Sequence, residues 1–311
     1  PVLARFLIRR SVQAVVVCVG VSFLTFGLMY LLPADPVAAI AGVKVSPETA
    51  QRIRHELGLD RPFIVQYGMY VARLMRGDLG RSYVTQQAVA EAIAQRILPT
   101  ALLAVAAWSI AIVAGALLTC LAVLRPWWAR VAFAFSTSFL AIPPFWLGLA
   151  LLYVFAFLVP IFPLGGFSLK GAILPALALS AGLAATYVRV LEANLREVLD
   201  QPYVQAARAK GLTERRVVIV HGLRNAVLPV FTLVSLDLAG LLGGVTLTET
   251  VFHWPGLGRL AVEAVFNQDI PMLMGVVLVT TAILVVMNLV TDLLYAVIDP
   301  RLRQSGGESW R

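Results

Sequence analysis

The chain has 311 residues, of which 59% are hydrophobic and only 14% are charged. This composition lies outside the range of soluble globular domains and inside that of integral membrane proteins. The formal net charge of +8 would suit a nucleic-acid-binding protein, but the places where the basic residues gather argue against that class.

Apolar stretches of about 20 residues, the length that crosses a bilayer, recur along the chain. We predict six transmembrane helices, at about residues 9–32, 98–124, 131–159, 172–196, 227–247 and 272–297. The first stretch is too long for a removable signal peptide and lacks a small-residue cleavage site. We therefore expect an all-α integral membrane protein.

The basic residues predict how these helices are oriented. They precede the first helix, bracket the turn between the second and third, fill the segment after the fourth and follow the sixth. By the positive-inside rule these four places are cytoplasmic, so both termini are expected on the cytoplasmic side. The residues concerned are Arg5, Arg9, Arg10, Arg125, Arg130, Arg208, Lys210, Arg215, Arg216, Arg224, Arg301 and Arg303.

The segment 33–97 is predicted to be a long extracytoplasmic loop with helices of its own. Pro47 suits a first helical position, and Gly58 ends that helix. Apolar residues then recur at the spacing of an amphipathic helix that lies on the membrane surface or against the spans, at Phe63, Tyr67, Val71 and Leu74. Residues 77–80 predict a turn and residues 89–97 a helix that feeds the second span. The loop is either a structural cap or a docking platform for an extracytoplasmic partner.

Two features inside the predicted spans bear on a solute pathway. Pro143 and Pro144 should break or kink the third span. Asp237 lies in the middle of the fifth, where a carboxylate is costly and usually faces a cavity or a partner. Ser235 lies near the same face. Asp237 either lines a pathway or makes a buried hydrogen bond between helices, and the sequence leaves both readings open.

The string Trp254-Pro255-Gly256-Leu257-Gly258 predicts a tight re-entrant turn near the outer surface. Loops at membrane depth are tolerated only where they are buried in protein or line water. Trp254, Pro255 and Gly256 are therefore candidates for an outer gate, with a surface cap as the alternative.

Catalytic machinery is not recognisable in the sequence. None of the three lysines (Lys44, Lys170 and Lys210) precedes Ser or Thr, so the chain has no phosphate-cradling Gly-x-x-x-x-Gly-Lys-Ser/Thr loop. The histidines stand in different loops without Cys or carboxylate at ligand spacing, so no metal site is expected. We expect a protein that is not an enzyme and holds no cofactor of its own.

Residues 199–231 form a polar, strongly basic segment between the fourth and fifth spans. Asp200 can cap a short helix that has Pro202 in its next turn. Gly211 can end this helix in a left-handed conformation, and Thr213 can cap a second one. We therefore expect a compact helix-turn-helix outside the membrane, which indicates a docking partner.

This segment resembles the "EAA" loop of the membrane subunits of ABC importers. Ala206-Ala207, Gly211 and Leu228-Pro229 match its alanine pair, glycine and closing proline, whereas Gln205 stands where the family usually has glutamate. The resemblance implies that the loop docks in a cleft of an ATPase subunit and transmits its closure. The predicted coupling residues are Tyr203, Gln205, Ala206, Ala207, Arg208, Gly211 and Arg215. For the basic ones, lipid contact is the alternative.

Further strings, in order along nearly the whole chain, resemble the peptide and nickel branch of ABC importer permeases. They lie at residues 57–62, 76–82, 142–148, 249–258 and 299–302. The closest resemblance is to the first of the two permeases of dipeptide and oligopeptide importers, the one with the long first outer loop.

The resemblance implies a type I permease fold. Residues 1–32 would form the cytoplasmic N-terminus and first helix, 33–97 the extracytoplasmic loop, and 98–311 a five-helix core with the coupling loop at about 199–226. The chain would form half of a pathway for short peptides across the bacterial plasma membrane. Its partners would be a second homologous permease, two ATPase subunits that hold ATP and Mg, and an extracytoplasmic binding protein. Nickel or glutathione is the alternative substrate, and a stand-alone ion-coupled carrier is the alternative from a different class.

Overall fold

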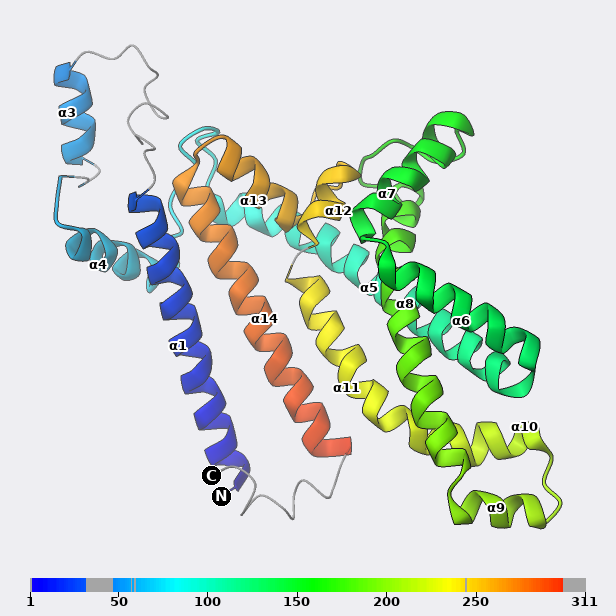
Figure 1. Ribbon diagram of the computed structural model, residues 1–311. Coiled ribbons are helices and arrows are strands. Elements are labelled where there is room, and N and C mark those ends of the chain that lie inside the picture. Colours follow the sequence, from blue (N-terminus) through cyan, green and yellow to red (C-terminus); the bar gives the residue numbers. More distant parts are fainter. Residues whose placement is uncertain (1, 32–46, 57, 59, 244, 299–311) are drawn as a thin grey trace.

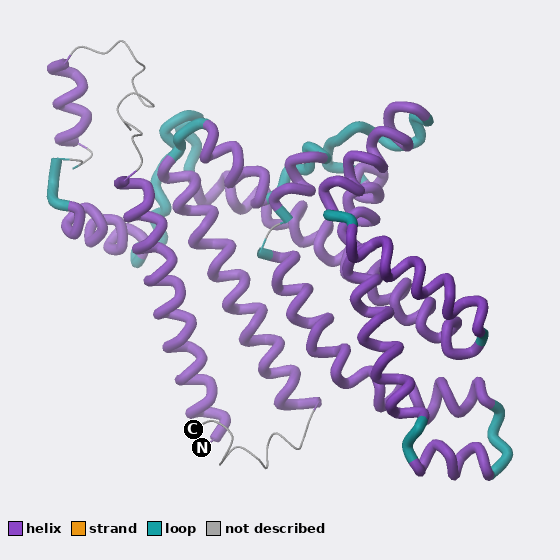
Figure 2. The backbone as a smooth tube through the Cα atoms, viewed as in Figure 1, coloured by secondary structure: helices purple, strands orange, loops and turns teal. Residues whose placement is uncertain are grey.

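The computed structural model describes residues 2–31, 47–56, 58, 60–243 and 245–298. Among these residues the fold is helical, and the β-type pairing is confined to an isolated bridge between Arg81 and Ala88 (Figure 2). The predicted string at 299–302 and the basic residues Arg301 and Arg303 lie outside the described residues.

Five long helices form the body of the molecule (Figure 1). They are α1 (Val2–Leu31), α5 (Val89–Leu124), α8 (Leu169–Leu199), α11 (Leu223–Leu242) and α14 (Ile270–Ile298). Shorter α-helices join them: α3 (Pro47–Glu56), α4 (Phe63–Leu74), α6 (Pro126–Ala141), α7 (Pro144–Leu152), α9 (Pro202–Ala209), α10 (Glu214–Arg216), α12 (Thr246–Val251) and α13 (Leu257–Phe266). Two π-helical turns, η1 (Tyr153–Leu158) and η2 (Val217–Gly222), extend α7 and lead into α11.

The helices confirm an all-α membrane fold with up to six spans. Within the described residues α1, α5, α8 and α14 are each long and apolar enough to cross a bilayer, and two bent pairs complete the six. One pair is α6 with α7 and η1, which bends by 100° at Pro143 and Pro144. The proline rings exclude a continuous helix there, so the predicted break of the third span is confirmed. The other pair, which ends in α11, bends by 49°.

Helix α5 starts earlier than predicted. Instead of a separate helix at 89–97, one continuous helix of 36 residues runs through Pro99. At 1.5 Å per residue it is about 54 Å long, whereas the hydrocarbon core of a bilayer is about 30 Å thick. Its first turns extend beyond the core of the bundle, where Val89 and Ile93 pack against Leu257, Met272 and Val276 of α13 and α14.

Helix α8 is the central element of the bundle. It packs along α5 and also contacts α6, α7 and α11. Small residues permit the close approach of α5 and α8: a Cβ at Gly115 would lie only 2.9 Å from the Cβ of Tyr187. The lower part of α8, with Leu191 and Leu195, shares one core with Val204, Val217 and Val218.

Helices α1 and α4 lie outside this core. Only 6% of the apolar stretch of α1 is buried, and α1 packs against α14. An ion pair of 2.8 Å between Arg10 and Asp292 joins the two helices. As predicted, the apolar side of α4 lies against a span, with Phe63 and Tyr67 packed on Phe23 and Phe26 of α1.

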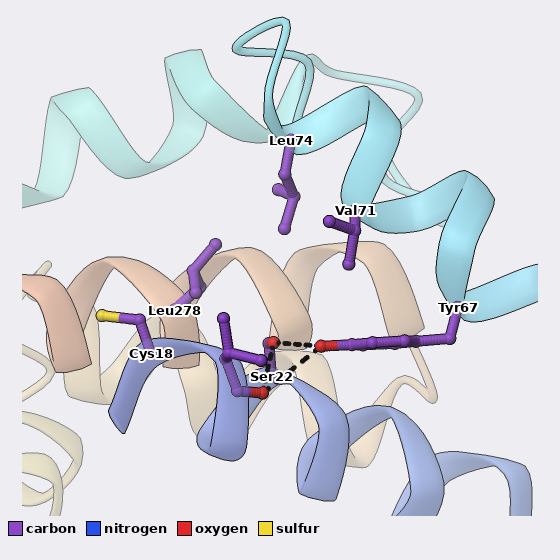
Figure 3. A pocket seen from close by; sticks show the side chains of 7 residues that line it. Cys18, Ser22, Tyr67, Val71, Leu74 and Leu278 are labelled. Carbon is purple, nitrogen blue, oxygen red and sulfur yellow. Dashed lines mark hydrogen bonds between the residues drawn. The ribbon is translucent and has the colours of Figure 1, made fainter. Parts of the chain in front are cut away.

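A cavity of about 260 Å³ lies between α1, α4 and α14 (Figure 3). Its lining is apolar apart from the hydroxyls of Ser22 and Tyr67, which share a hydrogen bond of 2.9 Å. The Tyr67 hydroxyl also lies 3.3 Å from the Val19 carbonyl oxygen. Both polar groups are therefore satisfied inside the chain, and the cavity has no free polar anchor.

Candidate functional site

Two segments at opposite ends of the bundle carry most of the predicted functional residues (Figure 1). The first, residues 199–226, contains α9, α10 and the start of α11, and we call it the helical loop. The second, residues 252–258, joins α12 to α13, and we call it the buried turn. Asp237, on α11, lies between them along the chain.

The first helix of the helical loop is capped one residue later than predicted. Helix α8 runs to Leu199, and Asp200 is its C-cap, with its N–H bonded to the Arg196 carbonyl oxygen. Gln201 then takes the extended N-cap conformation of α9, and Pro202 follows at the first helical position. The prediction that Asp200 caps the short helix was therefore wrong, because the long helix before it claims that residue.

The turn between α9 and α10 is formed as predicted. Gly211 has a φ of +80°, which a residue with a Cβ rarely adopts. Its N–H bonds to the Arg208 carbonyl oxygen and that of Leu212 to the Ala207 carbonyl oxygen, which is the Schellman ending of a helix. Thr213 is the N-cap of α10 through its backbone, without a side-chain hydrogen bond.

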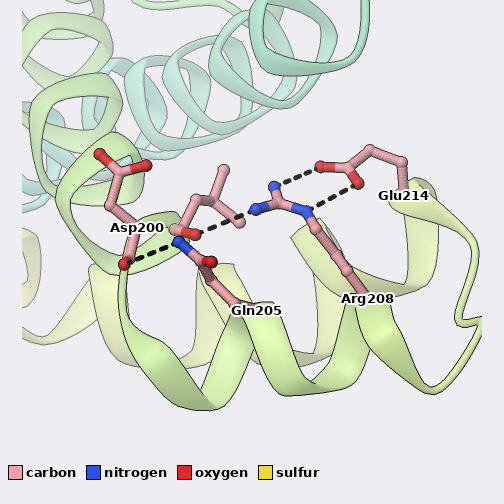
Figure 4. A network of polar contacts seen from close by, with 5 residues as sticks. Asp200, Gln205, Arg208 and Glu214 are labelled. Atoms are coloured by element: carbon pink, nitrogen blue, oxygen red, sulfur yellow. Dashed lines mark hydrogen bonds and ion pairs between the residues drawn. The ribbon is translucent and has the colours of Figure 1, made fainter.

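The Arg208 side chain joins α9 to α10 and to the end of α8 (Figure 4). Its guanidinium makes a bidentate pair with Glu214, at 2.7 and 3.1 Å, and donates a third hydrogen bond of 3.2 Å to the Leu199 carbonyl oxygen. The hydrogen bond with Glu214 raises the pKa of Arg208, and the same bond lowers the pKa of Glu214. The pair is exposed and contributes little stability, so its main effect is to fix the angle between the ends of α9 and α10.

The helical loop has an inner and an outer face. Val204 is fully buried and Ala207 is only 6% exposed, because both side chains lie on the side of α9 that faces the bundle. The other predicted coupling residues are exposed: Tyr203, Gln205, Ala206, Arg208, Gly211 and Arg215. Ala207 is thus placed as a packing residue behind the outer face, whereas Tyr203 is 46% exposed and its hydroxyl accepts a hydrogen bond of 2.7 Å from the Asn225 side chain.

The buried turn is closed against α5. Trp254 is 1% exposed, and its indole N–H donates a hydrogen bond of 3.0 Å to the Pro99 carbonyl oxygen. Around the indole lie Leu103, Ala107 and Leu179, and the ring of Phe167 meets it edge-on. Gly256 is buried and Pro255 is partly exposed. In this structure the turn is part of the core of the protein rather than an open surface.

A buried carboxylate that the sequence did not single out holds this turn. Glu249 of α12 is fully buried. Its carboxylate accepts hydrogen bonds from the Thr100 hydroxyl, at 2.8 Å, and from the Arg259 backbone N–H, at 3.0 Å. The Thr100 hydroxyl in turn accepts the Leu257 N–H at 2.8 Å. Burial raises the pKa of Glu249, and these hydrogen bonds oppose that rise.

Gly256 completes the contact. A Cβ built at this position would overlap the Glu249 carboxylate, so the backbone of the turn lies directly on it. The signal in the sequence was faint: one acid in the otherwise uncharged string Leu247-Thr248-Glu249-Thr250-Val251, with a threonine directly after Pro99. Nothing in the local pattern relates the two segments, which are 149 residues apart.

A second buried carboxylate joins the loop before α5 to the start of α14. Asp269 is 4% exposed and accepts hydrogen bonds from the Ser82 hydroxyl and from the Tyr83 N–H, the latter at 3.0 Å. Burial raises the pKa of Tyr83. The loop before α5 and the turn before α14 are therefore joined at the same end of the bundle as the buried turn.

The two polar residues predicted on the fifth span have different environments. The Ser235 hydroxyl is buried and donates to the Phe231 carbonyl oxygen of its own helix at 2.8 Å. Asp237 is partly exposed and interacts electrostatically with Tyr187 of α8. In the part of the chain that the structure describes, no three His, Cys, Asp or Glu side chains cluster as a metal site.

Known proteins resemble the chain over nearly its whole length. Residues 111–304 match the family described as binding-protein-dependent transport system inner membrane component, and residues 3–104 match the N-terminal family of such components. A protein from Escherichia coli (strain K12), named glutathione transport system permease protein GsiC, is 36% identical over 301 residues. The protein of that name from Salmonella choleraesuis is 37% identical. Each alignment covers 96% of this chain and 98% of the relative.

Proposed function

This chain belongs to the inner membrane components of binding-protein-dependent transport systems, and from this premise we propose that it forms half of a transmembrane pathway for short peptides. Such components are non-catalytic, multi-pass permease subunits of ABC importers, here of the peptide, nickel and glutathione type. A second homologous permease forms the other half of the pathway. An extracytoplasmic binding protein delivers the substrate.

The observation that carries the coupling role is the outer face of the helical loop. It is an ordered surface outside the apolar bundle, packed from behind by Val204 and Ala207 and held at its edge by the exposed Arg208–Glu214 pair. Tyr203 offers an aromatic anchor, and Ala206 is small and exposed, so a partner surface can approach closely. We assign this face to an ATPase subunit, which binds ATP and Mg, and we place it and both termini on the cytoplasmic side.

The relatives' names bear on the substrate. They are named for glutathione transport, and glutathione is itself a tripeptide with a γ-linked first residue. Its uptake therefore falls within the proposed short-peptide class and makes glutathione the first compound to test. Nickel remains the alternative within the same family.

Transport tests the substrate. The two permeases, the ATPases and the binding protein are reconstituted in proteoliposomes, and uptake of labelled glutathione, of a labelled dipeptide and of nickel ions is measured with and without ATP. We expect ATP-dependent uptake of at least one of the two peptides. Uptake of nickel ions but of neither peptide would show that the substrate is a metal ion. Uptake by this chain in the absence of the ATPases would show that it is a carrier and not part of an ATP-driven importer.

A matched pair of variants tests the coupling face. Ala206→Trp adds bulk to the exposed face of α9, and Ala90→Trp adds the same bulk to an exposed position of α5 at the opposite end. We expect Ala206→Trp to weaken co-purification of the ATPase by about tenfold, equivalent to 1.4 kcal/mol of binding free energy, with normal insertion. Ala90→Trp should keep the ATPase. Equal retention by both variants would place the interface elsewhere.

A further inference from the structure

The centre of the bundle contains polar groups that the described chain leaves unsatisfied. The Tyr187 hydroxyl and the Asn194 side-chain nitrogen, both on α8, are buried and make no hydrogen bond within the described residues. They are seven residues apart, about two helical turns, and so lie on one face of α8. Buried polar groups without a partner are rare in native proteins and need an explanation.

Tyr187 is held in place and reaches towards α11. It is 2% exposed and packs against Gly115 of α5 so closely that no side chain fits there. Tyr187 shares a core with Val230 and Val234 of α11, and Asp237, one helical turn beyond Val234, interacts with the Tyr187 hydroxyl. The phenol is therefore a fixed group beside a carboxylate, and it has a donor to offer that carboxylate.

Asp237 stands at the edge of the open side of α11. That helix packs against α5, α8 and α14, but Leu236 is 49% exposed and no atom lies within 4 Å of a Cβ at Gly240. Asp237 is itself partly exposed. A carboxylate facing lipid in mid-membrane is strongly disfavoured, so the open side of α11 must face the pathway or a partner rather than lipid.

No cation of the described chain pairs with Asp237. The neighbouring Ser235 hydroxyl donates its proton to the Phe231 carbonyl oxygen in a hydrogen bond, and it carries no charge that could balance an ammonium group. An unpaired carboxylate on an open helix side favours a positively charged group that arrives from outside the chain. The α-ammonium group of a short peptide, with an ordinary pKa of about 7.7–8.0, is such a group.

We propose that Asp237 binds the ammonium group of the transported peptide and that Tyr187 is a positioning residue that orients the carboxylate. This inference rests on the proposed peptide pathway and adds a point of recognition within it. It explains why an acid is present at this depth of the fifth span, where a carboxylate is costly.

The first test compares a tripeptide with a free amino group with its N-acetylated form in the reconstituted importer. We expect Asp237→Asn to lower uptake of the free-amine peptide by about tenfold, a loss of 1.4 kcal/mol, and to leave residual uptake of the acetylated peptide unchanged. Asp237→Glu should restore part of the uptake. Tyr187→Phe should raise the KM for the free-amine peptide without changing kcat, and Ser235→Ala should change neither.

The second test measures ligand binding at Asp237 without measuring transport. A hydrophobic carbodiimide modifies Asp237 in the purified complex, and mass spectrometry follows the reaction. A dipeptide amide with a free amino group should slow formation of the carbodiimide adduct, and its N-acetylated form should not. Peptide amides are used because a free carboxyl group would itself consume the carbodiimide. If neither peptide is transported, the proposed function fails while this protection still decides the site. Equal protection by both peptides, equal loss of both in Asp237→Asn, or loss of the partner permease from that variant would overturn the ammonium site.

Discussion

The helical loop and the buried turn are both tight, ordered segments, yet they are built in opposite ways. The helical loop is stabilised from its inner face, an exposed ion pair fixes the angle between its helices, and Tyr203 and Ala206 are left uncovered. The buried turn is stabilised by Glu249, a carboxylate with no exposed surface, and of its own residues only His253 is exposed and Pro255 partly exposed. The comparison teaches that one end of the bundle presents an exposed, braced surface, as the proposed coupling role requires, while the other end buries its turn in the core.

The largest effect should come from adding bulk to the buried turn. In Gly256→Val the new side chain would overlap the Glu249 carboxylate, and overpacking of this kind costs about 3 kcal/mol or more. We expect a marked fall in the thermal unfolding temperature of the purified protein. Gly68→Val is the control, since α4 has open space around Gly68. If the two variants unfolded at the same temperature, the turn would not be the rigid part of the molecule.

The next effect concerns the carboxylate itself. Glu249→Gln keeps the shape but turns an amide NH₂ towards the Arg259 N–H or the Thr100 hydroxyl, and an unsatisfied buried group costs about 1–3 kcal/mol. Thr100→Val removes the other end of the contact. Because the two groups interact, the loss of unfolding free energy in the double variant should be smaller than the sum of the losses in the two single variants. Additive costs would show that the hydrogen bond does not hold the turn.

The helical loop should respond more weakly in stability and more strongly in coupling. In Gly211→Val the φ of +80° becomes unfavourable by about 1 kcal/mol, and α10 is misaligned. We expect normal insertion but loss of transport-coupled ATP hydrolysis. Gly211→Asn is the control, because Asn tolerates this conformation. Full transport by a well-expressed Gly211→Val protein would remove the loop from the coupling path.

The smallest effect is a difference in pH response. Arg208 lowers the pKa of Glu214 below 4.5, so its stabilisation is complete above that value and is lost as the pH falls through the folded pKa. Burial raises the pKa of Glu249 above 4.5, so the folded state binds the proton more tightly and stability falls as the pH rises through the folded pKa. Hydrogen exchange, corrected for intrinsic rates, should show opposite slopes in the two segments. Arg208→Ala and Glu249→Gln should each flatten only their own slope.

Local patterns predicted much of this molecule. The apolar stretches, the break at Pro143 and Pro144 and the glycine turn at Gly211 each depend on neighbours in sequence. The described residues have four helices and two bent pairs that could cross a membrane, and Gly211 has the expected left-handed φ. Asp200 shows the limit of such patterns. Asp200 lies between α8 and α9 and could cap either helix. It is the C-cap of α8, the longer helix, which is packed along its length.

The remaining features depend on contacts between distant segments. Ala207 is buried because α8 and η2 pass behind α9. The alanine pair in the sequence does not show which of its two residues faces them. Pro99 is read locally as a helix boundary, but α5 continues through it because residues on both sides are packed, Ile93 against α13 and Leu103 beside Trp254. Glu249 accepts a hydrogen bond from Thr100, which is 149 residues away in the sequence. Its role in holding the turn can therefore be seen only in the folded structure.

The length of α5 has a mechanical consequence. A helix of 36 residues without a break behaves as a stiff rod, and its first turns carry α13 and the start of α14 while its middle lies in the bundle against α8. A small tilt of the rod near its middle must swing the far end through a larger arc, in proportion to the lever arm. The helix does not hinge at Pro99, because the indole N–H of Trp254 donates a hydrogen bond to the Pro99 carbonyl oxygen and holds the helix at this point. A rotation of the bundle would therefore displace α13 and the start of α14 at the far end of α5 rather than bend the helix at Pro99.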